Sequence, residues 1–365
     1  MKKCLSIIVT LALAFSAAAC GKNTDAPVQR EAAADANVAE RVENDDNNSS
    51  TGGQTAYPVT LTDQLGRQVT IEKEPETLVS GYYISTSLLI ALGCKDRLIG
   101  VEAKAESRSI YRLSAPALTR LPSVGSAKEF DLEGCAALNP DLVVVPVKLK
   151  DAVPALEELG LTVLAVNPED QELLTQAALL LGKATNTLPA ANSLIAFQTQ
   201  QLALLRDALS GAAAPSVYLA SNSSLLSAAG PEMYQNSLIT NAGGTNATGE
   251  LTGNYWSEIS YEQLLAWDPE YIVLAADAGY TVDSVMSDSA LAQCQAVKEG
   301  RVLKFPNAIE AWDSPVPGSV LGSLWLASAL HPEKYSDEEW KRAATDFYET
   351  FYGFTPDLTS LYAEE

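Results

Sequence analysis

Short, continuous runs of apolar residues alternate with segments of helical spacing along most of this 365-residue chain. The runs at 142–147 (LVVVPV) and 161–166 (LTVLAV) are apolar throughout, as in strands covered on both faces of a parallel sheet. Between them, the segment 151–160 (DAVPALEELG) has the spacing of a helix. Because strand and helix alternate in this way, the sequence predicts an α/β fold whose sheets are mostly parallel, with helices on both faces.

The same alternation occurs on either side of one long helical segment, 187–211. This segment has Pro189 in its first turn and Gly211 just past its end, with no breaker between them. At about 1.5 Å per residue, such a helix would span on the order of 33 Å. The pattern predicts two Rossmann-like lobes, 57–186 and 212–365, joined by one long helix that limits hinge closure.

Two further elements are predicted from local pattern. Alternating segments on either side of Leu65, Gly66 and Arg67 indicate a hairpin at the start of the first lobe. The segment 319–330 (SVLGSLWLASAL) predicts an amphipathic helix that packs on the second sheet.

Two stretches of the chain, 130–145 (FDLEGCAALNPDLVVV) and 259–274 (ISYEQLLAWDPEYIVL), can be aligned without a gap. Glu133 then falls on Glu262, and each stretch ends in an apolar strand. One glutamate therefore occupies the same place in each predicted lobe.

The position of these glutamates allows two interpretations. Asp131 is a good N-cap, and Ser260 with Gln263 has the spacing of a capping box, so Glu133 and Glu262 lie in first helical turns. A carboxylate is favoured there by the helix dipole alone. Two equivalent carboxylates could also dock on a partner with two equivalent basic pockets, and spacing leaves both explanations open.

The N-terminus has the features of an export signal, which we assign to residues 1–20. Two lysines precede an apolar run from Cys4 to Phe15 that is too short to span a membrane, and small residues then lead to Cys20. Small residues before a cysteine resemble a bacterial lipoprotein processing site, and we expect Cys20 to be lipidated. Cleavage at the soluble A-x-A pattern 17–19 is the alternative. Residues 21–56 are polar and predict a disordered tether.

Composition and charge exclude several classes of function. The net charge of −22 and the absence of any run of Lys or Arg exclude a nucleic-acid partner. The body holds three widely spaced cysteines, Cys94, Cys135 and Cys294, which predict buried apolar residues rather than disulfides or a metal site. The only histidine is His331, so no histidine-based zinc site or catalytic triad is predicted, and we expect no cofactor.

A surface hydrolase is the alternative from another class. Glycosidase chemistry needs two carboxylates facing one bond, and the candidates would be Glu133 and Glu262. On separate lobes joined by a long helix, they would lie too far apart. The sequence holds no serine elbow, P-loop or zinc motif, so we predict no catalytic residues.

Several stretches in sequence resemble one family: VTLTDQLGRQVTIEKEPETLVS, LLIALGCKDRLIGV, LPSVGSAKEFDLEGCAALNPDLVVV, NYWSEISYEQLLAWDPEYIVL and VKEGRVLKF. Together they cover most of 57–330 and resemble the substrate-binding lipoproteins of ABC importers that have a helical spine, the class III periplasmic binding proteins. Members capture iron-siderophores, haem, cobalamin and some oxyanions.

The resemblance implies a place and partners for the chain. It implies an extracytoplasmic monomer, anchored to the cell membrane through a lipid on Cys20, that delivers its ligand to an ABC permease dimer with its ATPase. In the family, a glutamate on each lobe docks against permease arginines, and the matching positions here are Glu133 and Glu262.

In such folds the ligand lies where the strand ends of the two lobes face each other. Residues in the loops after strands are therefore the candidates for ligand contacts: Tyr82, Tyr83, Ser126, Lys128, Lys148, Asn222, Tyr255, Trp256, Trp312, Asp313 and Ser314. Aromatic rings with scattered polar groups suit a large ligand, and they suit a buried core almost as well.

The ligand that the sequence favours is a metal chelate, first a ferric siderophore and then a corrinoid or haem. Trp256 matches a tryptophan that lines the cleft in cobalamin-binding relatives, but the corresponding aromatic position in the first lobe is Ala127 here. The alternative is an oxyanion such as molybdate or tungstate. Lys128, Lys148, Arg108 and Arg112 could meet its oxygens or the carboxylates of a ferric chelate.

Overall fold

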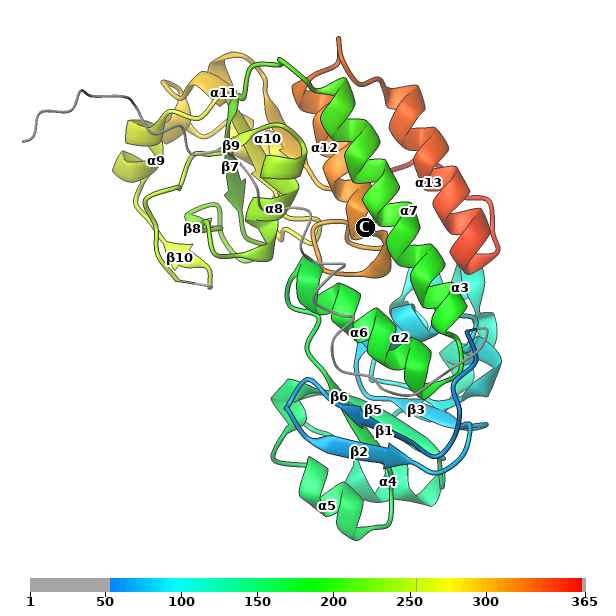
Figure 1. The fold of residues 1–365 in the computed structure, drawn as a ribbon. Coiled ribbons are helices and arrows are strands. Elements are labelled where there is room, and N and C mark those ends of the chain that lie inside the picture. The colour runs from blue at the N-terminus through cyan, green and yellow to red at the C-terminus, as the bar shows by residue number, and fades with distance from the viewer. Residues whose placement is uncertain (1–52, 254, 363–365) are drawn as a thin grey trace, which may run out of the picture. The chain divides into compact units, whose positions relative to one another are not determined.

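The computed structural model describes residues 53–253 and 255–362, and it has two α/β lobes connected by one long helix (Figure 1). The predicted signal peptide at 1–20, Cys20 and most of the predicted tether lie outside the described residues. Within the described residues, no helix is both long and apolar enough to cross a membrane.

The first lobe contains a four-stranded parallel sheet in the order β4-β3-β5-β6. Its central strand β5 is buried at every position, as its continuous apolar sequence predicts. The predicted hairpin is confirmed as a separate antiparallel pair, β1 with β2. The strands are β1 (Val59–Thr62), β2 (Gln68–Ile71), β3 (Leu78–Ser80), β4 (Leu98–Gly100), β5 (Leu142–Pro146) and β6 (Val163–Val166); the α-helices are α2 (Tyr83–Ala91), α3 (Ser109–Ser114), α4 (Leu132–Ala137), α5 (Val153–Glu158) and α6 (Gln171–Ala184).

The second lobe contains a six-stranded mixed sheet in the order β10-β8-β7-β11-β12, with β9 also paired to β7. Strands β9, β7, β11 and β12 run parallel, and β8 and β10 are antiparallel additions at one edge. The strands are β7 (Ser216–Ala220), β8 (Ser227–Ala228), β9 (Thr245–Asn246), β10 (Ser257–Glu258), β11 (Tyr271–Leu274) and β12 (Val302–Lys304); the α-helices are α8 (Tyr234–Asn241), α9 (Tyr261–Trp267), α10 (Val282–Met286), α11 (Gln295–Lys298), α12 (Val320–Leu330) and α13 (Asp337–Tyr352).

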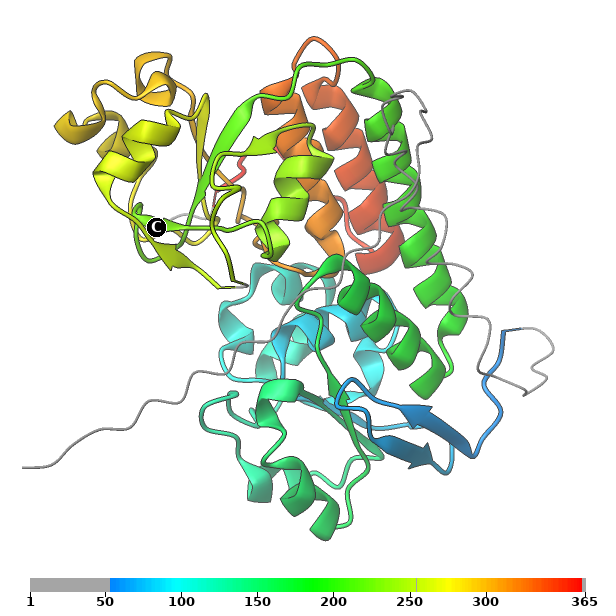
Figure 2. The ribbon, with the colours of Figure 1, turned by 60° about the vertical axis from the view of Figure 1, so that its left-hand side comes forward.

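The connecting helix α7 (Leu188–Ala208) lies within the predicted segment 187–211. It packs against α6 of the first lobe and against α8, α12 and α13 of the second, and Figures 1 and 2 both show α7 and α13 side by side. Helix α13 in turn contacts α2, where the Tyr352 hydroxyl donates to the Ser87 carbonyl at 3.3 Å. Two helices therefore connect the lobes, which stiffens the arrangement more than one helix would.

The helix predicted at 319–330 is present and packs on the second sheet, but it is not amphipathic as predicted. Ten of the eleven residues of this helix, α12, are buried. It contacts the second sheet as predicted, with the Tyr271 hydroxyl of β11 donating to the Ala329 carbonyl at 3.4 Å and the Phe305 ring 5.1 Å from the Trp325 ring. Helices α7, α8 and α13 also pack against it. Gly322 permits this burial, because a side chain at that position would collide with the Trp312 carbonyl.

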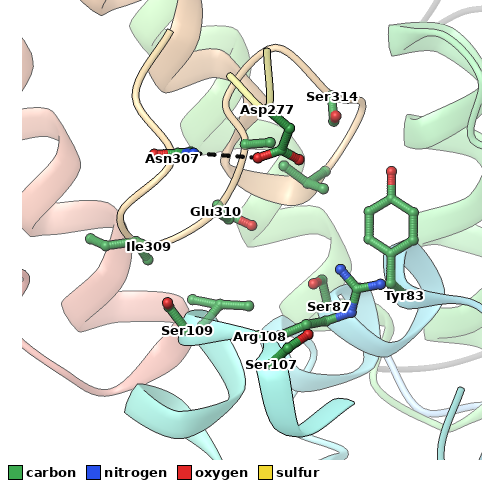
Figure 3. A pocket seen from close by; sticks show the side chains of 13 residues that line it. Tyr83, Ser87, Ser107, Arg108, Ser109, Asp277, Asn307, Ile309, Glu310 and Ser314 are labelled. Carbon is green, nitrogen blue, oxygen red and sulfur yellow. Dashed lines mark hydrogen bonds between the residues drawn. The ribbon is translucent and has the colours of Figure 1, made fainter. Parts of the chain in front are cut away.

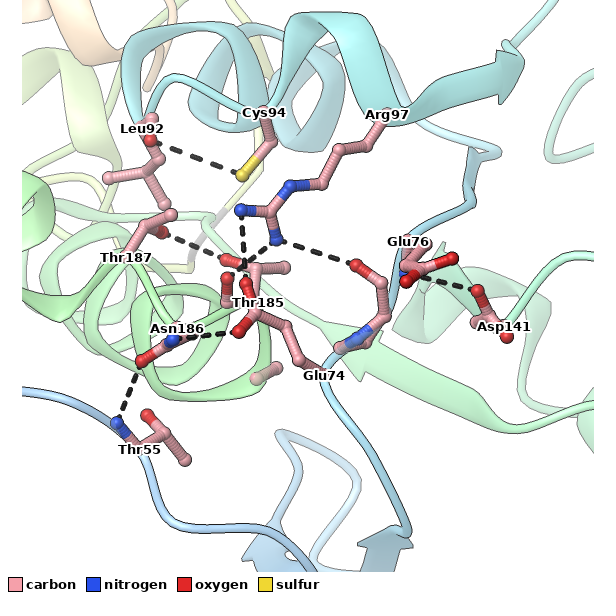
Figure 4. Close-up of polar contacts among 12 residues, drawn as sticks. Thr55, Glu74, Glu76, Leu92, Cys94, Arg97, Asp141, Thr185, Asn186 and Thr187 are labelled. Carbon is pink, nitrogen blue, oxygen red and sulfur yellow. Dashed lines mark hydrogen bonds and ion pairs between the residues drawn. The ribbon is translucent and has the colours of Figure 1, made fainter.

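The start of the described chain is fixed to the junction between α6 and α7 (Figure 4). The Thr55 amide donates to Asn186 Oδ1 at 2.8 Å, and Asn186 Nδ2 donates to Glu74 at 2.8 Å. Arg97 completes this group by donating to the Thr185 carbonyl and pairing with Glu74. Asn186 has φ of 59°, a left-handed conformation that asparagine tolerates better than most residues. These contacts hold the lower end of the connecting helix.

Candidate ligand-binding site

A cavity of about 480 Å³ is lined by residues from both lobes (Figure 3). The first lobe contributes Tyr83, Ser87, Ser107, Arg108, Ser109 and Ile110. The second lobe contributes Asp277 and six residues from one loop, Asn307, Ile309, Glu310, Ala311, Ser314 and Val316. The second-lobe residues follow β11 and β12, and loops at the carboxyl ends of parallel strands are where α/β folds bind ligands.

Arg108 is the only cation among the residues that line this cavity. Its Nε donates to Glu102 Oε1 at 3.0 Å, and its guanidinium lies 4.4 Å from the centre of the Tyr83 ring. Neither terminal nitrogen of Arg108 has a hydrogen-bond partner among the described residues. The guanidinium is therefore held in place through Nε, and its two terminal nitrogens remain as donors for a ligand.

Glu102 fixes the position of Arg108. It is 4% exposed, and besides Arg108 it accepts hydrogen bonds from the Tyr111 hydroxyl at 2.8 Å and from Thr86 Oγ1 at 2.7 Å. These donors come from α3 and from the first turn of α2, so the carboxylate connects the end of β4 to both helices. A buried carboxylate with this many donors is fully satisfied, and its fixed position fixes the arginine.

Hydroxyl groups surround Arg108 on the first-lobe side of the cavity. Ser87 lines the cavity and is buried. The Tyr83 phenol also faces the cavity, and burial raises its pKa, so it stays neutral and can donate. Ser109 accepts from Arg112 and Ser107 donates to the Lys104 carbonyl. This wall offers hydrogen-bond donors to an acceptor-rich ligand.

The loop of the second lobe is held by the C-terminal segment of the described chain. The amides of Asn307 and Ala308 both donate to the Leu361 carbonyl, at 3.0 and 3.1 Å. The Asn307 side chain donates to the Ala276 carbonyl at 3.0 Å and to Asp277 at 3.3 Å. The last residues thus position a loop that lines the cavity.

Glu310 is the buried acid of this loop. Its Oε1 accepts from the Tyr348 hydroxyl at 2.9 Å, and its Oε2 is buried without a hydrogen-bond partner. Burial raises its pKa to about 7. Gly318 makes room for it, since a side chain at that position would collide with Glu310 Oε1.

Of the residues predicted to contact the ligand, Tyr83 and Ser314 line the cavity. Asp313 lies beneath the loop, where its Oδ2 accepts from the Ala276 amide at 3.1 Å and burial raises its pKa to about 6. Trp312 lies in the core, with its indole donating to Tyr348 at 2.8 Å and its ring against Trp340. It packs the loop from behind instead of facing the cavity.

The remaining predicted contacts lie elsewhere on the two lobes. Lys148 pairs with Glu169 at 3.0 Å, and Tyr82 packs at 5.1 Å against the Tyr83 ring. Tyr255 is 78% exposed, and Trp256 is half-buried against the core. None of these lines the cavity, nor do three further predicted residues: Ser126, Lys128 and Asn222.

Several lining residues were not predicted, although they lie in loops after strands, which is where the sequence analysis places ligand contacts. Asp277 and Asn307 directly follow predicted strands, and the segment 107–109 follows the strand at 97–101 by a few residues. Arg108 was considered only as one of several cations. Glu310 gave no signal, because its burial depends on contacts with α13.

The two aligned glutamates, Glu133 and Glu262, are exposed in the first turns of α4 and α9. The predicted caps are confirmed: Asp131 accepts from the Gly134 amide at 2.8 Å, and Ser260 forms a capping box with Gln263. Both side chains are available to a partner, and their docking role stays a prediction.

The cysteines of the body behave as predicted, since Cys94, Cys135 and Cys294 are buried and free. The described residues contain no group of His, Cys, Asp or Glu side chains arranged to hold a metal ion. His331 is buried.

The family model and the relatives that match this chain are all binding proteins. The profile described as "Periplasmic binding protein" matches residues 78–308. The molybdate-binding protein MolA of Haemophilus influenzae is 25% identical over 326 residues, with 81% of this chain and 92% of MolA covered. A cobalamin-binding protein of Halobacterium salinarum is 25% identical over 286 residues, with 76% of this chain and 75% of that protein covered.

Solved structures agree in fold. A periplasmic solute binding protein from Veillonella parvula superposes with a TM-score of 0.72 at 26% identity, covering 82% of this chain and 94% of that one. The structure of MolA with bound molybdate, the cognate binding protein of an ABC transporter, gives a TM-score of 0.71 at 22% identity, covering 82% and 99%. The predicted fold class is confirmed.

Proposed function

The chain belongs to the periplasmic binding protein family, and from that premise we propose that it captures an oxygen-rich anion in the cavity lined by Arg108. It is a substrate-binding protein of an ABC importer, which acts outside the cytoplasm and delivers a small-molecule ligand to the permease. It is a binding protein rather than an enzyme, as its relatives are.

The observation that carries this proposal is the guanidinium of Arg108. Its Nε is used by Glu102, while its two terminal nitrogens have no partner among the described residues and the guanidinium lies at the cavity wall. A fork of this kind binds two oxygens of one anion with defined geometry. The hydroxyls of Ser87 and Tyr83 and the amide of Asn307 add polar groups around the same space.

The lining does not favour a flat macrocycle. Tyr83 is the one aromatic residue among the lining residues, and its ring already stacks with Arg108. The ground for a corrinoid or haem was an aromatic cleft, and Trp256 and Trp312 lie away from this cavity. We therefore rank an oxyanion of the molybdate class first.

The volume of the cavity supports a second candidate, an anionic ferric chelate. About 480 Å³ exceeds the space of one tetrahedral oxyanion and lies in the range of pockets for drug-sized ligands. Chelates built from carboxylates or catecholates present the same anionic oxygens, so Arg108 would serve both. The relatives bind molybdate in one case and cobalamin in another, which leaves the choice to experiment.

Two further parts of the proposal concern the surroundings of the lobes. The exposed carboxylates of Glu133 and Glu262 support docking on two equivalent basic surfaces of a permease dimer. The lipoprotein-like sequence before Cys20 supports a lipid anchor on that residue. Replacing Cys20 by Ala should then release the protein from the membrane fraction.

The test of the ligand is a calorimetric and thermal-shift panel. Molybdate, tungstate, several ferric siderophores, haem and cobalamin are titrated into the purified protein, with sulfate as a tetrahedral anion for comparison. We expect binding of an oxyanion or an anionic ferric chelate, with stabilisation of about 2.7 kcal/mol at a hundredfold excess over Kd. Binding of cobalamin or haem alone would contradict the proposal.

A further inference from the structure

One group at the cavity has an unused hydrogen-bonding capacity that the ligand proposal does not explain. Glu310 lines the cavity, is nine-tenths buried, and leaves its Oε2 without a partner among the described residues. Buried carboxyl oxygens in folded proteins are nearly always hydrogen-bonded, because an unsatisfied one costs the full loss of its hydration. A carboxyl left in this state beside an open cavity points to a partner that arrives with the ligand.

The surroundings of Glu310 favour its neutral form. Tyr348 donates to Oε1, and no Lys, Arg or His forms an ion pair with Glu310 in the described part of the chain. A neutral carboxyl has one O–H to donate, and an anionic ligand offers oxygens that accept. An ionised carboxylate would instead repel an anion at the same place.

We propose that neutral Glu310 donates a hydrogen bond from its free oxygen to the bound anion, so that ligand capture takes up a proton from water. The inference rests on the proposed function, since it requires an anionic ligand in this cavity. It assigns Glu310 as a residue that selects for anions with acceptor oxygens and couples their binding to pH. No covalent bond forms, and the proton stays on Glu310 in the complex.

Other titratable and charged groups around Glu310 do not replace it in this role. Tyr348 and Tyr352 on α13 have pKa values raised far above the physiological range by burial, so they stay neutral. Arg108 faces the cavity from the first lobe and stays charged. Asp277, which follows β11, is exposed, and Asp313 of the same loop is occupied by the Ala276 amide.

The direction of the pH effect follows from linkage. In the free protein the pKa of Glu310 is raised to about 7 by burial, and an adjacent anion raises it further. The affinity is then highest below about pH 7, where Glu310 is already neutral, and falls as the pH rises. Above that value, each pH unit weakens binding by up to about tenfold until the pKa of the complex is reached.

The experiment is isothermal titration calorimetry of the full-length protein with molybdate, and separately with an anionic ferric chelate, from about pH 6 to about pH 9. Molybdate keeps its charge over this range, so a change in its affinity reports on the protein. Each titration near pH 8 is repeated in two buffers of different ionisation enthalpy, which measures the protons taken up. We expect an uptake that approaches one proton per ligand.

Two variants assign the proton. Glu310→Gln keeps an N–H donor at the same place and cannot titrate, so it should bind at pH 9 as tightly as at pH 6 and take up no proton. Asp313→Asn removes a neighbouring buried acid that does not line the cavity, and it should keep the pH dependence of the wild type. Proton uptake by the wild type is a readout that does not depend on any variant folding.

The outcomes separate this inference from the function on which it rests. Binding of either ligand with no proton uptake near pH 8, or with the pH dependence kept in Glu310→Gln, would overturn the role of Glu310 and leave the anion site intact. Failure of both ligands to bind at any pH would overturn the anion site itself. Uptake in the wild type and in Asp313→Asn, but not in Glu310→Gln, is the expected result.

Discussion

The two walls of the cavity differ in charge and in how they are held. The first-lobe wall carries Arg108 and hydroxyl donors, fixed by the buried Glu102 network. The second-lobe wall carries two acids, Asp277 and Glu310, on loops fixed by backbone contacts to the C-terminal segment. For the anion that we propose as the ligand, we expect affinity to come mainly from the first wall, and we expect the second wall to admit the anion only if its buried acid is neutral.

Among the variants that test the difference between the two walls, Arg108→Gln should cause the largest loss of ligand affinity. Loss of charge-assisted hydrogen bonds costs about 1.5–3 kcal/mol, which is roughly a ten- to hundredfold loss of affinity. Calorimetry with the ligand identified by the panel measures it. Arg112→Gln is the matched control, because Arg112 lies in α3, which begins directly after Arg108, but does not itself line the cavity, so its loss should leave affinity nearly unchanged. Equal losses of affinity in both variants would mean that the net charge of the protein attracts the ligand, and not the two terminal nitrogens of Arg108.

The fold of this protein was largely predictable from sequence, because apolar runs such as 142–147 report burial directly. The cavity was less predictable. Loop residues such as Asp277 could be found from their place after strands, but the burial of Glu310 and Trp312 depends on Tyr348 in a helix that begins far along the chain. Non-local packing of this kind leaves no pattern in the segment it affects, so aromatic loop residues were assigned to the ligand when one of them serves the core.

Changes to the residues that hold the second wall should mainly lower the free energy of unfolding of the protein. Tyr348→Phe leaves Glu310 Oε1 and the Trp312 indole without their partner, and a buried polar group left unsatisfied costs about 1–3 kcal/mol. Urea denaturation measures the loss. Tyr352→Phe, which removes one hydrogen bond of 3.3 Å to the Ser87 carbonyl, should cost less. If the two variants are equally stable, the loop is not held through Tyr348.

A smaller effect is expected from the C-terminal segment. A chain that ends at Phe354 frees the amides of Asn307 and Ala308, each worth about 0.5–1.5 kcal/mol in a hydrogen bond, and the loop they position should bind ligand several-fold more weakly. The control is a chain that ends at Tyr362, which keeps the Leu361 carbonyl. Unchanged affinity in the shorter chain would show that the loop of the second wall keeps its position without the C-terminal segment.

The smallest effect on affinity should come from Glu133→Lys and Glu262→Lys, since neither residue lines the cavity. Ligand Kd should stay within about twofold of the wild type, because exposed charges contribute little to a separate site. Ligand-stimulated ATP hydrolysis by the reconstituted importer should be lost, as charge reversal turns docking attraction into repulsion. Loss of affinity together with coupling would place these residues in the binding site and refute the docking role.

The central claim is that an anionic ligand sits against Arg108, and the anomalous scattering of its metal tests this most directly. Molybdenum or iron gives a peak that locates the ligand in a crystal of the complex, whichever of the two classes binds. The account predicts a peak in the cavity with ligand oxygens about 3 Å from a terminal nitrogen of Arg108. A peak beside Trp256 or Lys128, with the Arg108 fork unoccupied, would contradict it.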